Sequence, residues 1–275
     1  MRRGVVPGYH RVHTPRAPSL IAWATKSRFA KLVSAVTQSV NEHNKYQESY
    51  YEQADHTRIF PVATPYVWRH VDKVIGALDL KPGSRVLEIG AGMGRHAQLM
   101  SERGIQVVAT DLSSVLIEKL KEQTGAADIE AFVSDISELA QQTTERFDFA
   151  VGYFMLHHLL DLESAFRDLR AVLRPGARVA FCEPNAYHLP FYVQIALSRT
   201  ITWKGDRGIL NMRPSKLFPA MEAAGFVEMR CERFGFFPPL VANTKIGRVC
   251  ERGLEAVRLL EPIRAFQIFS ATVVP

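Results

Sequence analysis

The residues with the clearest chemical pattern are one carboxylate and three glycines that follow a short apolar run. Glu88 lies within the run 85–89, and Gly90, Gly92 and Gly94 come directly after it. Glycine lacks a Cβ atom, so such a turn lets a ligand approach the backbone closely, and the helix predicted after it directs free N–H groups at that ligand. The run is apolar enough for a buried strand. These residues predict a strand, a turn and a helix that bind a ligand carrying a nucleoside, with the carboxylate available for a cationic amino group.

The spacing of the glycines separates two classes of nucleotide-binding protein. Dinucleotide-binding proteins use G-x-G-x-x-G, which would need a glycine at the position of Arg95. This chain instead has E-x-G-x-G-x-G, and the pattern resembles motif I of the class I S-adenosylmethionine-dependent methyltransferases, in their small-molecule, UbiE-like branch. The resemblance implies S-adenosyl-L-methionine as cofactor and S-adenosyl-L-homocysteine as product. It also implies cofactor contacts by Glu88, Gly90, Ala91, Gly92 and Gly94.

Acidic residues also stand at the ends of the next two predicted strands. Asp111 ends the apolar run 106–111, where a strand-helix-strand unit binds the ribose hydroxyls of a nucleoside, and Leu112 follows it. After the third predicted strand come Asp135 and Ile136. The resemblance implies that Asp135 accepts a hydrogen bond from the adenine amino group and that Ile136 packs on the ring. Helix capping is the alternative role for both aspartates.

The fourth predicted strand, within residues 147–159, is almost continuously apolar, as the centre of a parallel sheet should be. Tyr153 and Phe154 lie at its carboxyl end and are placed to contact the methionine part of the cofactor. An aspartate that begins this strand and a Leu-His-His sequence that follows it are further features that resemble the small-molecule enzymes of this class. A Leu-x-Pro-Gly sequence at residues 173–176, where we expect the preceding helix to end before a fifth strand at residues 177–181, is another.

Three histidines are candidates for a general base, because histidine titrates near neutrality. We place His157 first, followed by His158 and His188. The alternative for the adjacent pair is that one histidine binds the backbone at the turn while the other faces outward. We predict no metal site, because adjacent histidines should diverge and no carboxylate is spaced to join them.

Two segments are expected to cover the site. The resemblance implies that a segment before motif I folds over the cofactor, and Tyr51, with Tyr50 as the alternative, is the aromatic residue expected to do so unless these residues simply pack. Residues 186–213 form an insertion rich in aromatic and aliphatic residues. Such an insertion usually covers the acceptor, and its composition suggests a lipophilic or aromatic acceptor.

The fold that the resemblance implies is Rossmann-like α/β: a seven-stranded, mostly parallel sheet with one antiparallel strand and helices on both faces. Residues 45–275 would form this methyltransferase domain. Residues 244–266 predict one long helix whose buried side carries Val249, Leu254, Val257, Leu260 and Ile263.

Charge is concentrated at the start of the chain. The net charge is +6, yet residues 1–41 hold seven Lys or Arg and no acid, which leaves the remainder at −1. A near-neutral domain and the lack of an Asp-Pro-Pro-Tyr or Asn-Pro-Pro-Tyr sequence after strand four both disfavour a nucleic-acid partner. Residues 1–44 predict a basic tail and an amphipathic helix, which could be a lid, a peripheral membrane contact or an organelle-targeting segment.

The three cysteines are far apart, so neither a disulfide framework nor a zinc site is expected, and the simplest location is the cytoplasm. The expected activity is methyl transfer to oxygen, nitrogen or carbon of a small acceptor. The rival interpretations are a nicotinamide-dependent oxidoreductase, which the glycine spacing disfavours, and a protein of this fold that binds the cofactor and catalyses a different reaction. Oligomeric state is not predicted.

Overall fold

The computed structural model of the chain describes residues 42–49, 61–124, 129–197 and 206–275. They form one seven-stranded sheet with the order β3-β2-β1-β4-β5-β7-β6. All neighbouring strands are parallel except that β7 runs antiparallel to both β5 and β6, which confirms the predicted fold class. The strands are β1 (Arg85–Ile89), β2 (Gln106–Asp111), β3 (Ile129–Val133), β4 (Phe147–Tyr153), β5 (Leu173–Pro184), β6 (Phe226–Phe234) and β7 (Phe266–Val273).

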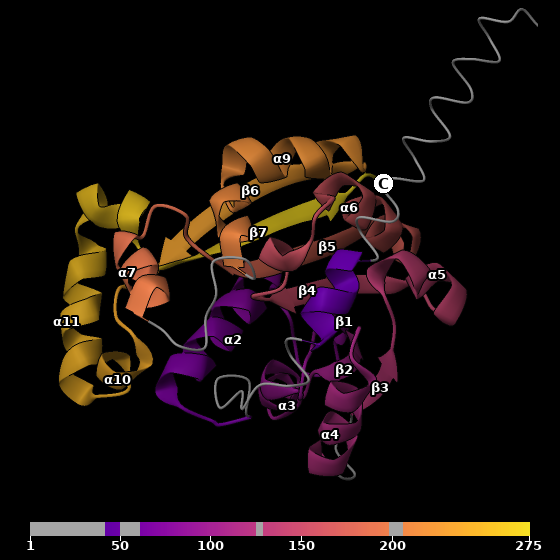
Figure 1. Cartoon of the computed structure of the whole chain (residues 1–275), viewed down its shortest axis with the longest axis horizontal. Coiled ribbons are helices and arrows are strands. Elements are labelled where there is room, and N and C mark those ends of the chain that lie inside the picture. The colour runs from indigo at the N-terminus through magenta and orange to yellow at the C-terminus, as the bar shows by residue number, and fades with distance from the viewer. Residues whose placement is uncertain (1–41, 50–60, 125–128, 198–205) are drawn as a thin grey trace, which may run out of the picture. The chain divides into compact units, whose positions relative to one another are not determined.

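Helices cover both faces of this sheet (Figure 1). The helices α2 (Pro65–Leu78), α3 (Arg95–Ser101) and α4 (Ser114–Thr124) share one apolar core with the sheet, whereas α5 (Leu139–Gln142), α6 (Leu162–Ala171) and α9 (Pro214–Ala223) share the other. The remaining elements are η1 (Ile136–Glu138), η2 (Leu156–His158), α7 (Leu189–Leu197), η3 (Arg207–Asn211), α10 (Pro239–Ala242), α11 (Lys245–Ala256) and η4 (Arg258–Ile263). Alternation of side chains along each strand divides the apolar residues between the two cores.

The fifth strand begins earlier than the sequence predicts. Leu173 already pairs with Phe147, and the Phe147 N–H donates to the Val172 carbonyl at 2.9 Å. The predicted helix end at residues 173–176 is therefore wrong, because α6 stops at Ala171 and the chain enters the sheet before the Pro-Gly turn. The register shift between Phe147 and Phe149 accommodates that turn.

The prediction for residues 244–266 is wrong in two respects. The segment is divided into α11 and η4, and its apolar side is not buried. Val249 is 59% exposed and Ile263 47% exposed, whereas the polar Glu251 is 2% exposed. Hydrogen bonds to Glu251 decide this orientation, since its Oε1 accepts the backbone N–H of Phe236 and of Phe237.

Contacts divide the chain into a unit of residues 1–42 and a unit of residues 43–275, and nearly all described residues belong to the second. Within it, residues 43–49 are helical and precede α2. None of the helices in the described ranges combines the length and apolarity needed to cross a membrane.

Candidate active site

The glycine turn after β1 has the backbone that its sequence predicts. Gly90, Gly92 and Gly94 all have positive φ, at 67°, 55° and 81°, in the region where a side chain is strained. Among the residues that the structure describes, none has an atom within 4 Å of a Cβ added at Gly92, so none of them fills the space beside the backbone there. A Cβ atom at Gly90 would instead approach Met155 to 2.8 Å. The turn thus leaves room for a ligand beside Gly92.

Asp111 holds this turn from the end of β2. Its Oδ2 accepts the Gly92 N–H at 2.8 Å, and its Oδ1 accepts the Ser113 N–H at 3.0 Å. Burial raises the pKa of Asp111, and these backbone hydrogen bonds oppose that rise. Ser113 caps α4 with its own hydroxyl, since its Oγ accepts the Leu116 N–H at 3.3 Å. Ser113 therefore fills the capping role that was the alternative for Asp111, and contact of Asp111 and Leu112 with the cofactor stays a prediction.

Glu88 is the least satisfied polar group near the turn. Its side chain is completely buried, and neither carboxylate oxygen has a hydrogen-bond partner among the residues that the structure describes. Burial, with a smaller contribution from the charge of Asp111, raises the pKa of Glu88 to about 8. An unpartnered buried carboxylate costs free energy unless a ligand supplies a donor or a positive charge. Glu88 is therefore a ready partner for a cationic group.

Asp135 lies at the next strand end, where it caps η1 as in the alternative role. Its Oδ1 accepts the N–H and the hydroxyl of Ser137, each at 2.8 Å. Its Oδ2 accepts the side-chain amide of Asn44 at 2.6 Å, so the helix at residues 42–49 lies next to this strand end. Ile136 is half-buried against the core. Contact of Asp135 and Ile136 with adenine stays a prediction.

The end of β4 contributes to an aromatic cluster rather than to an open surface. Tyr153 is 4% exposed, stacks on His96 at a centroid distance of 4.0 Å, and donates to the Met100 sulfur at 3.7 Å. Phe154 has the positive φ of 57° and packs edge-on against the His70 ring. Contact of Tyr153 and Phe154 with the methionine part of the cofactor stays a prediction.

Both core histidines of this cluster are unsuited to proton transfer. Burial lowers the pKa of His70 to about 3 and lowers that of His96 well below its usual value. His70 binds the Tyr66 carbonyl through Nδ1 at 2.8 Å, whereas its Nε2 has no partner in the described part of the chain. These histidines therefore act as neutral aromatic residues.

Glu183, at the end of β5, organises the turn after β4. Its Oε1 accepts the N–H groups of Met155 and Leu156 at 2.9 and 2.7 Å, and its Oε2 lies 2.6 Å from His157 Nδ1. Glu183 is completely buried and His157 is 6% exposed. Burial alone would lower the pKa of His157, but the charges and hydrogen bonds of Glu183 and Asp206 outweigh burial and raise it to about 9.

A histidine with that pKa is protonated at neutral pH and has no lone pair with which to accept a proton. The environment of His157 therefore argues against the general-base role that we placed first. His157 positions the turn instead, by bridging Glu183 and Asp206 as a cation. A Cβ atom at Gly208 would lie 1.8 Å from the His157 carbonyl oxygen, so η3 packs directly on η2.

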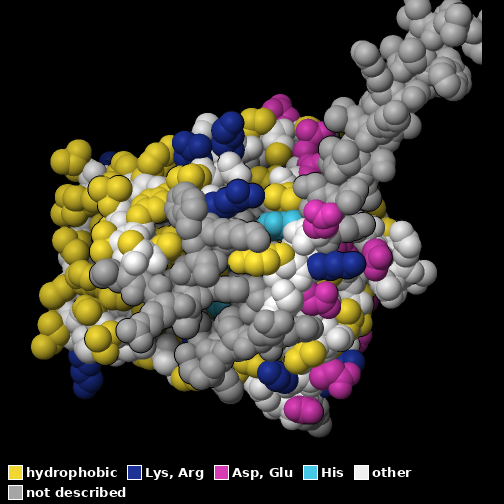
Figure 2. Space-filling view, viewed as in Figure 1, with side chains coloured by type: hydrophobic (Ala, Val, Ile, Leu, Met, Phe, Trp, Pro, Cys, Tyr) yellow, Lys and Arg dark blue, Asp and Glu magenta, His cyan; other side chains and the backbone are white. Residues whose placement is uncertain are grey.

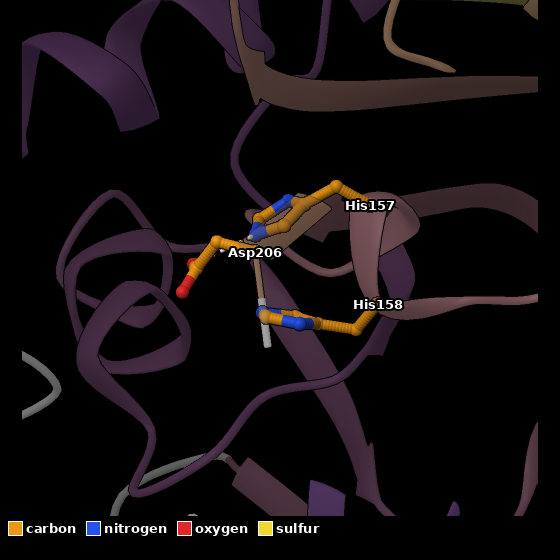
Figure 3. Close-up of side chains that lie close together, drawn as sticks. All are labelled: His157, His158 and Asp206. Atoms are coloured by element: carbon orange, nitrogen blue, oxygen red, sulfur yellow. Dashed lines mark ion pairs between the residues drawn. The ribbon is translucent and has the colours of Figure 1, made fainter. Parts of the chain in front are cut away.

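His157, His158 and Asp206 could together hold a metal ion, because their ligand atoms lie within 4.8 Å of one another. Figure 3 shows both imidazoles extending from η2 toward Asp206. Their ring centroids are 4.0 Å apart. Our reasons for excluding a metal were thus wrong, since the rings do not diverge and the carboxylate of Asp206, just before η3, joins them. The protonated His157 nevertheless accounts for this geometry by itself, with Asp206 Oδ1 at 3.8 Å from Nε2.

The third base candidate, His188, is buried and anchors the β5–α7 connection. Its Nδ1 lies 2.8 Å from the carbonyl oxygen of Ile263, so it joins this connection to η4 rather than facing a ligand. The insertion at 186–213 contains α7 and η3, and residues 198–205 lie outside the described ranges. Tyr51 and Tyr50 also lie outside them.

Sequence reasoning missed Glu183 and Asn44. Glu183 could have been found, because β4 and β5 were both predicted and the carboxyl ends of parallel strands meet at one edge of the sheet. Asn44 gave no such signal, since it belongs to a helix whose place against η1 depends on tertiary packing.

The residues present fit the cofactor that the resemblance implies. A nucleoside needs a carboxylate at the end of β2 and open backbone at the glycine turn, and Asp111 and Gly92 provide both. An α-amino group needs a buried carboxyl group that can ionise when the two pair, and Glu88 provides one. The same edge of the sheet carries all of these groups.

Comparison with known proteins agrees with this assignment. A family profile described as a methyltransferase domain matches residues 64–229. The tRNA 5-carboxymethoxyuridine methyltransferase of Escherichia coli is 30% identical over 134 residues, which are 47% of this chain and 51% of that protein. The chain is therefore aligned with only about half of that relative. The ubiquinone biosynthesis O-methyltransferase of Idiomarina loihiensis is 26% identical over 66% of this chain and 74% of its own.

Solved structures show the same fold at low identity. Phosphoethanolamine N-methyltransferase 2 of Haemonchus contortus, in complex with phosphomonomethylethanolamine and S-adenosylhomocysteine, superposes with a TM-score of 0.61 at 18% identity. That match covers 83% of this chain and 60% of the nematode enzyme. The strand order, the glycine turn and the family match over residues 64–229 together show that the chain belongs to the class I S-adenosylmethionine-dependent methyltransferases.

Proposed function

We propose that this protein transfers the methyl group of S-adenosyl-L-methionine to a small lipophilic or aromatic acceptor. The observation that carries the proposal is Glu88, a buried carboxylate without a partner in the described structure, beside an open glycine turn. The cofactor, when bound, supplies an electrophilic methyl group on a cationic sulfur. Glu88 would bind its amino group and Asp111 its ribose, with the backbone at Gly90, Ala91, Gly92 and Gly94 lying along it.

The chain's own contribution to the reaction would be alignment. Holding an acceptor atom about 3 to 3.5 Å from the methyl carbon, in line with the leaving sulfur, can supply about 7 to 11 kcal/mol at the upper limit. Neither His157, which is protonated, nor His188, which binds the Ile263 carbonyl oxygen, is suited to remove a proton, and His158 stays a candidate base. An acceptor that is already ionised or has a free lone pair would suit this site best.

The acceptor class rests on the insertion and on the relatives. Tyr187 and Leu189 at the start of the insertion are exposed, at 47% and 73%, beside the end of β5. One relative is named for ubiquinone biosynthesis and another for tRNA modification. The net charge of −1 that remains after residues 1–41 favours the small-molecule acceptor over tRNA.

The test is an assay of methyl transfer from labelled cofactor, with phenols, quinone precursors, polyketide-like compounds and bulk tRNA as separate arms. We expect label in a small-molecule arm and none in tRNA. Label in the tRNA arm alone would contradict the proposed acceptor. Tight cofactor binding with no transfer to any arm would favour the rival interpretation, in which the fold hosts a different reaction.

We predict that Asp111→Ala and Gly92→Val both weaken cofactor binding in calorimetric titration. Removing the Asp111 carboxylate should lower affinity at least tenfold, because a charge-assisted hydrogen bond contributes about 1.5 to 3 kcal/mol. Valine at Gly92 would fill the space that the ligand needs.

Gly83→Val is the matched control for backbone strain. Gly83 also has a positive φ, of 88°, and also has nothing within 4 Å of an added Cβ, but it lies in the turn before β1. It should lose stability to the same extent as Gly92→Val and keep its affinity for the cofactor. If all three variants bound the cofactor with the affinity of the wild type, the site would be assigned wrongly.

A further inference from the structure

We propose that a surface formed by α7, α10, α11 and η4 binds membranes that contain anionic lipids. This surface, here called the apolar surface, consists of the exposed side chains of Leu189, Val193, Leu240, Ile246, Val249 and Leu259. The proposal goes beyond methyl transfer and does not depend on it, because vesicle binding needs neither cofactor nor acceptor.

The side chains of the apolar surface are unusually exposed for their type. Leu240 and Leu259 are each 86% exposed, Ile246 78% and Leu189 73%. Figure 2 shows hydrophobic side chains gathered at the left of the molecule, over α7, α10 and α11, with charged side chains more frequent toward the other end. Single exposed apolar residues are normal on soluble proteins, but a group of this kind marks an interaction site.

The helix α11 is turned with its apolar side outward by strong polar contacts. Its buried side carries Gly247 and Glu251. Glu251 forms an ion pair with Arg69 of α2 and accepts the N–H groups of Phe236 and Phe237. Rotating α11 to bury Ile246 and Val249 would break these contacts and expose a carboxylate that is now 2% exposed. The outward apolar side is therefore fixed by the fold.

The elements of the apolar surface are joined to one another at the carboxyl edge of the sheet. The Asn185 side-chain amide, just after β5, donates to the Pro262 and Arg264 carbonyl oxygens at 2.8 and 2.7 Å. The His188 Nδ1 lies 2.8 Å from the Ile263 carbonyl oxygen. These contacts attach the start of α7 to η4, so the apolar side chains of both elements belong to one supported surface.

The charges around the apolar surface complement an anionic partner. Lys245, Arg252 and Arg258 are exposed, whereas the glutamates in the same segment, residues 238–263, are buried or half-buried. Glu251 and Glu255 both pair with Arg69. Arg252 also lines a cleft of about 540 Å³ between α11, α2 and β6, whose charged lining is mixed, with Asp72 and Glu232 beside the basic residues. Apolar side chains bordered by basic ones are typical of protein surfaces that lie on acidic membranes.

The same charges disfavour the other possible occupants. A second copy of the chain placed symmetrically on this surface would bring the basic residues of both copies together. The chain's own residues 1–41 carry seven Lys or Arg and no acid, so they would also meet like charge. A lipid surface with acidic headgroups supplies apolar and anionic partners at once.

The test is cosedimentation of the full-length protein with vesicles of phosphatidylcholine alone and of phosphatidylcholine mixed with phosphatidylglycerol. We expect binding to the anionic vesicles, weakened by added salt. The variant Leu240→Gln/Ile246→Gln should partition about tenfold more weakly, because two apolar side chains no longer enter the interface. Lys245→Gln/Arg252→Gln should weaken binding to anionic vesicles and leave the weak binding to phosphatidylcholine unchanged.

The matched control is Val115→Gln/Val227→Gln, which removes two exposed aliphatic side chains, each 38% exposed, from α4 and β6. It should bind vesicles as the wild type does. All variants should keep their melting temperature, since every changed residue is exposed. Unchanged vesicle binding in Leu240→Gln/Ile246→Gln would overturn the proposal. Residues 1–41 would then be the remaining source of the binding. If the same variant instead converted a dimer into a monomer, the apolar surface would be an interface between copies of the chain.

Discussion

Replacing Glu88 by glutamine is expected to make the protein without cofactor more stable at alkaline pH and to weaken its binding of S-adenosylmethionine. The pKa of Glu88 is raised to about 8 by burial. The folded protein therefore keeps a proton that the unfolded chain releases above about pH 4.5. The free energy of unfolding should fall as the pH rises from about 4.5 to 8, by an amount on the order of 5 kcal/mol at most.

Glutamine cannot ionise, so the free-energy cost of a buried negative charge at alkaline pH disappears. It leaves a buried amide without a partner among the described residues, which costs about 1 to 3 kcal/mol. We expect Glu88→Gln to raise the free energy of unfolding, measured by urea denaturation, by about 2 kcal/mol at pH 8.5 and not to raise it at pH 4.5. Affinity for the cofactor should fall about 10- to 100-fold, because the variant no longer offers a charge to the cofactor's amino group.

Proton release gives an independent measurement of the same residue. At pH 7 Glu88 is protonated without cofactor and should ionise when it pairs with the amino group, so binding should release close to one proton. Calorimetric titration in buffers of different ionisation enthalpy measures that number. The release should disappear in Glu88→Gln and persist in the control Glu102→Gln, which changes an exposed carboxylate after α3. Equal proton release in wild type and Glu88→Gln would refute the assignment.

Glu183→Ala is expected to cause the largest loss of stability, about 3 to 5 kcal/mol. The substitution leaves the cationic His157 buried without its nearest partner and removes the acceptor for two backbone N–H groups. Urea denaturation at pH 6.5 should show this loss. Glu232→Ala, which breaks an exposed ion pair with Lys73, should cost less than about 1 kcal/mol.

The dependence on pH identifies the ion pair as the cause. Because the pKa of His157 is raised from 6.5 to about 9, its stabilising contribution is complete below about pH 6.5 and is lost as the pH rises through 9. Glu183→Gln should flatten the fall in stability across that range relative to wild type. An identical fall in wild type and Glu183→Gln would show that the ion pair with Glu183 is not the cause of the pH dependence.

The fold class could be predicted because the resemblance implies it, and the motifs that carry the resemblance are short and lie at fixed spacings along the chain. Gly92 needs its left-handed backbone whatever surrounds it, and Asp111 lies at a fixed distance along the chain from that turn. The roles of histidines could not be predicted in this way. His157 becomes a cation only because β5 brings Glu183 to one of its nitrogens and the residue before η3, Asp206, lies near the other.

The orientation of α11 shows the same limit. Helical periodicity predicts one apolar side, but it does not say whether that side meets the core or the solvent. Glu251 decides this through its contacts with Arg69 and the backbone after β6, which lie far apart in the chain.

The sequence by itself thus carried the motifs whose resemblance implies the family and its fold, because these motifs are short and their glycines and carboxylates lie at fixed spacings, whereas contact of these residues with the cofactor stays a prediction. Only the tertiary structure decided the charge of His157, the unpartnered state of Glu88 and the outward side of α11. Each of these depends on burial and on partners that non-local contacts bring together.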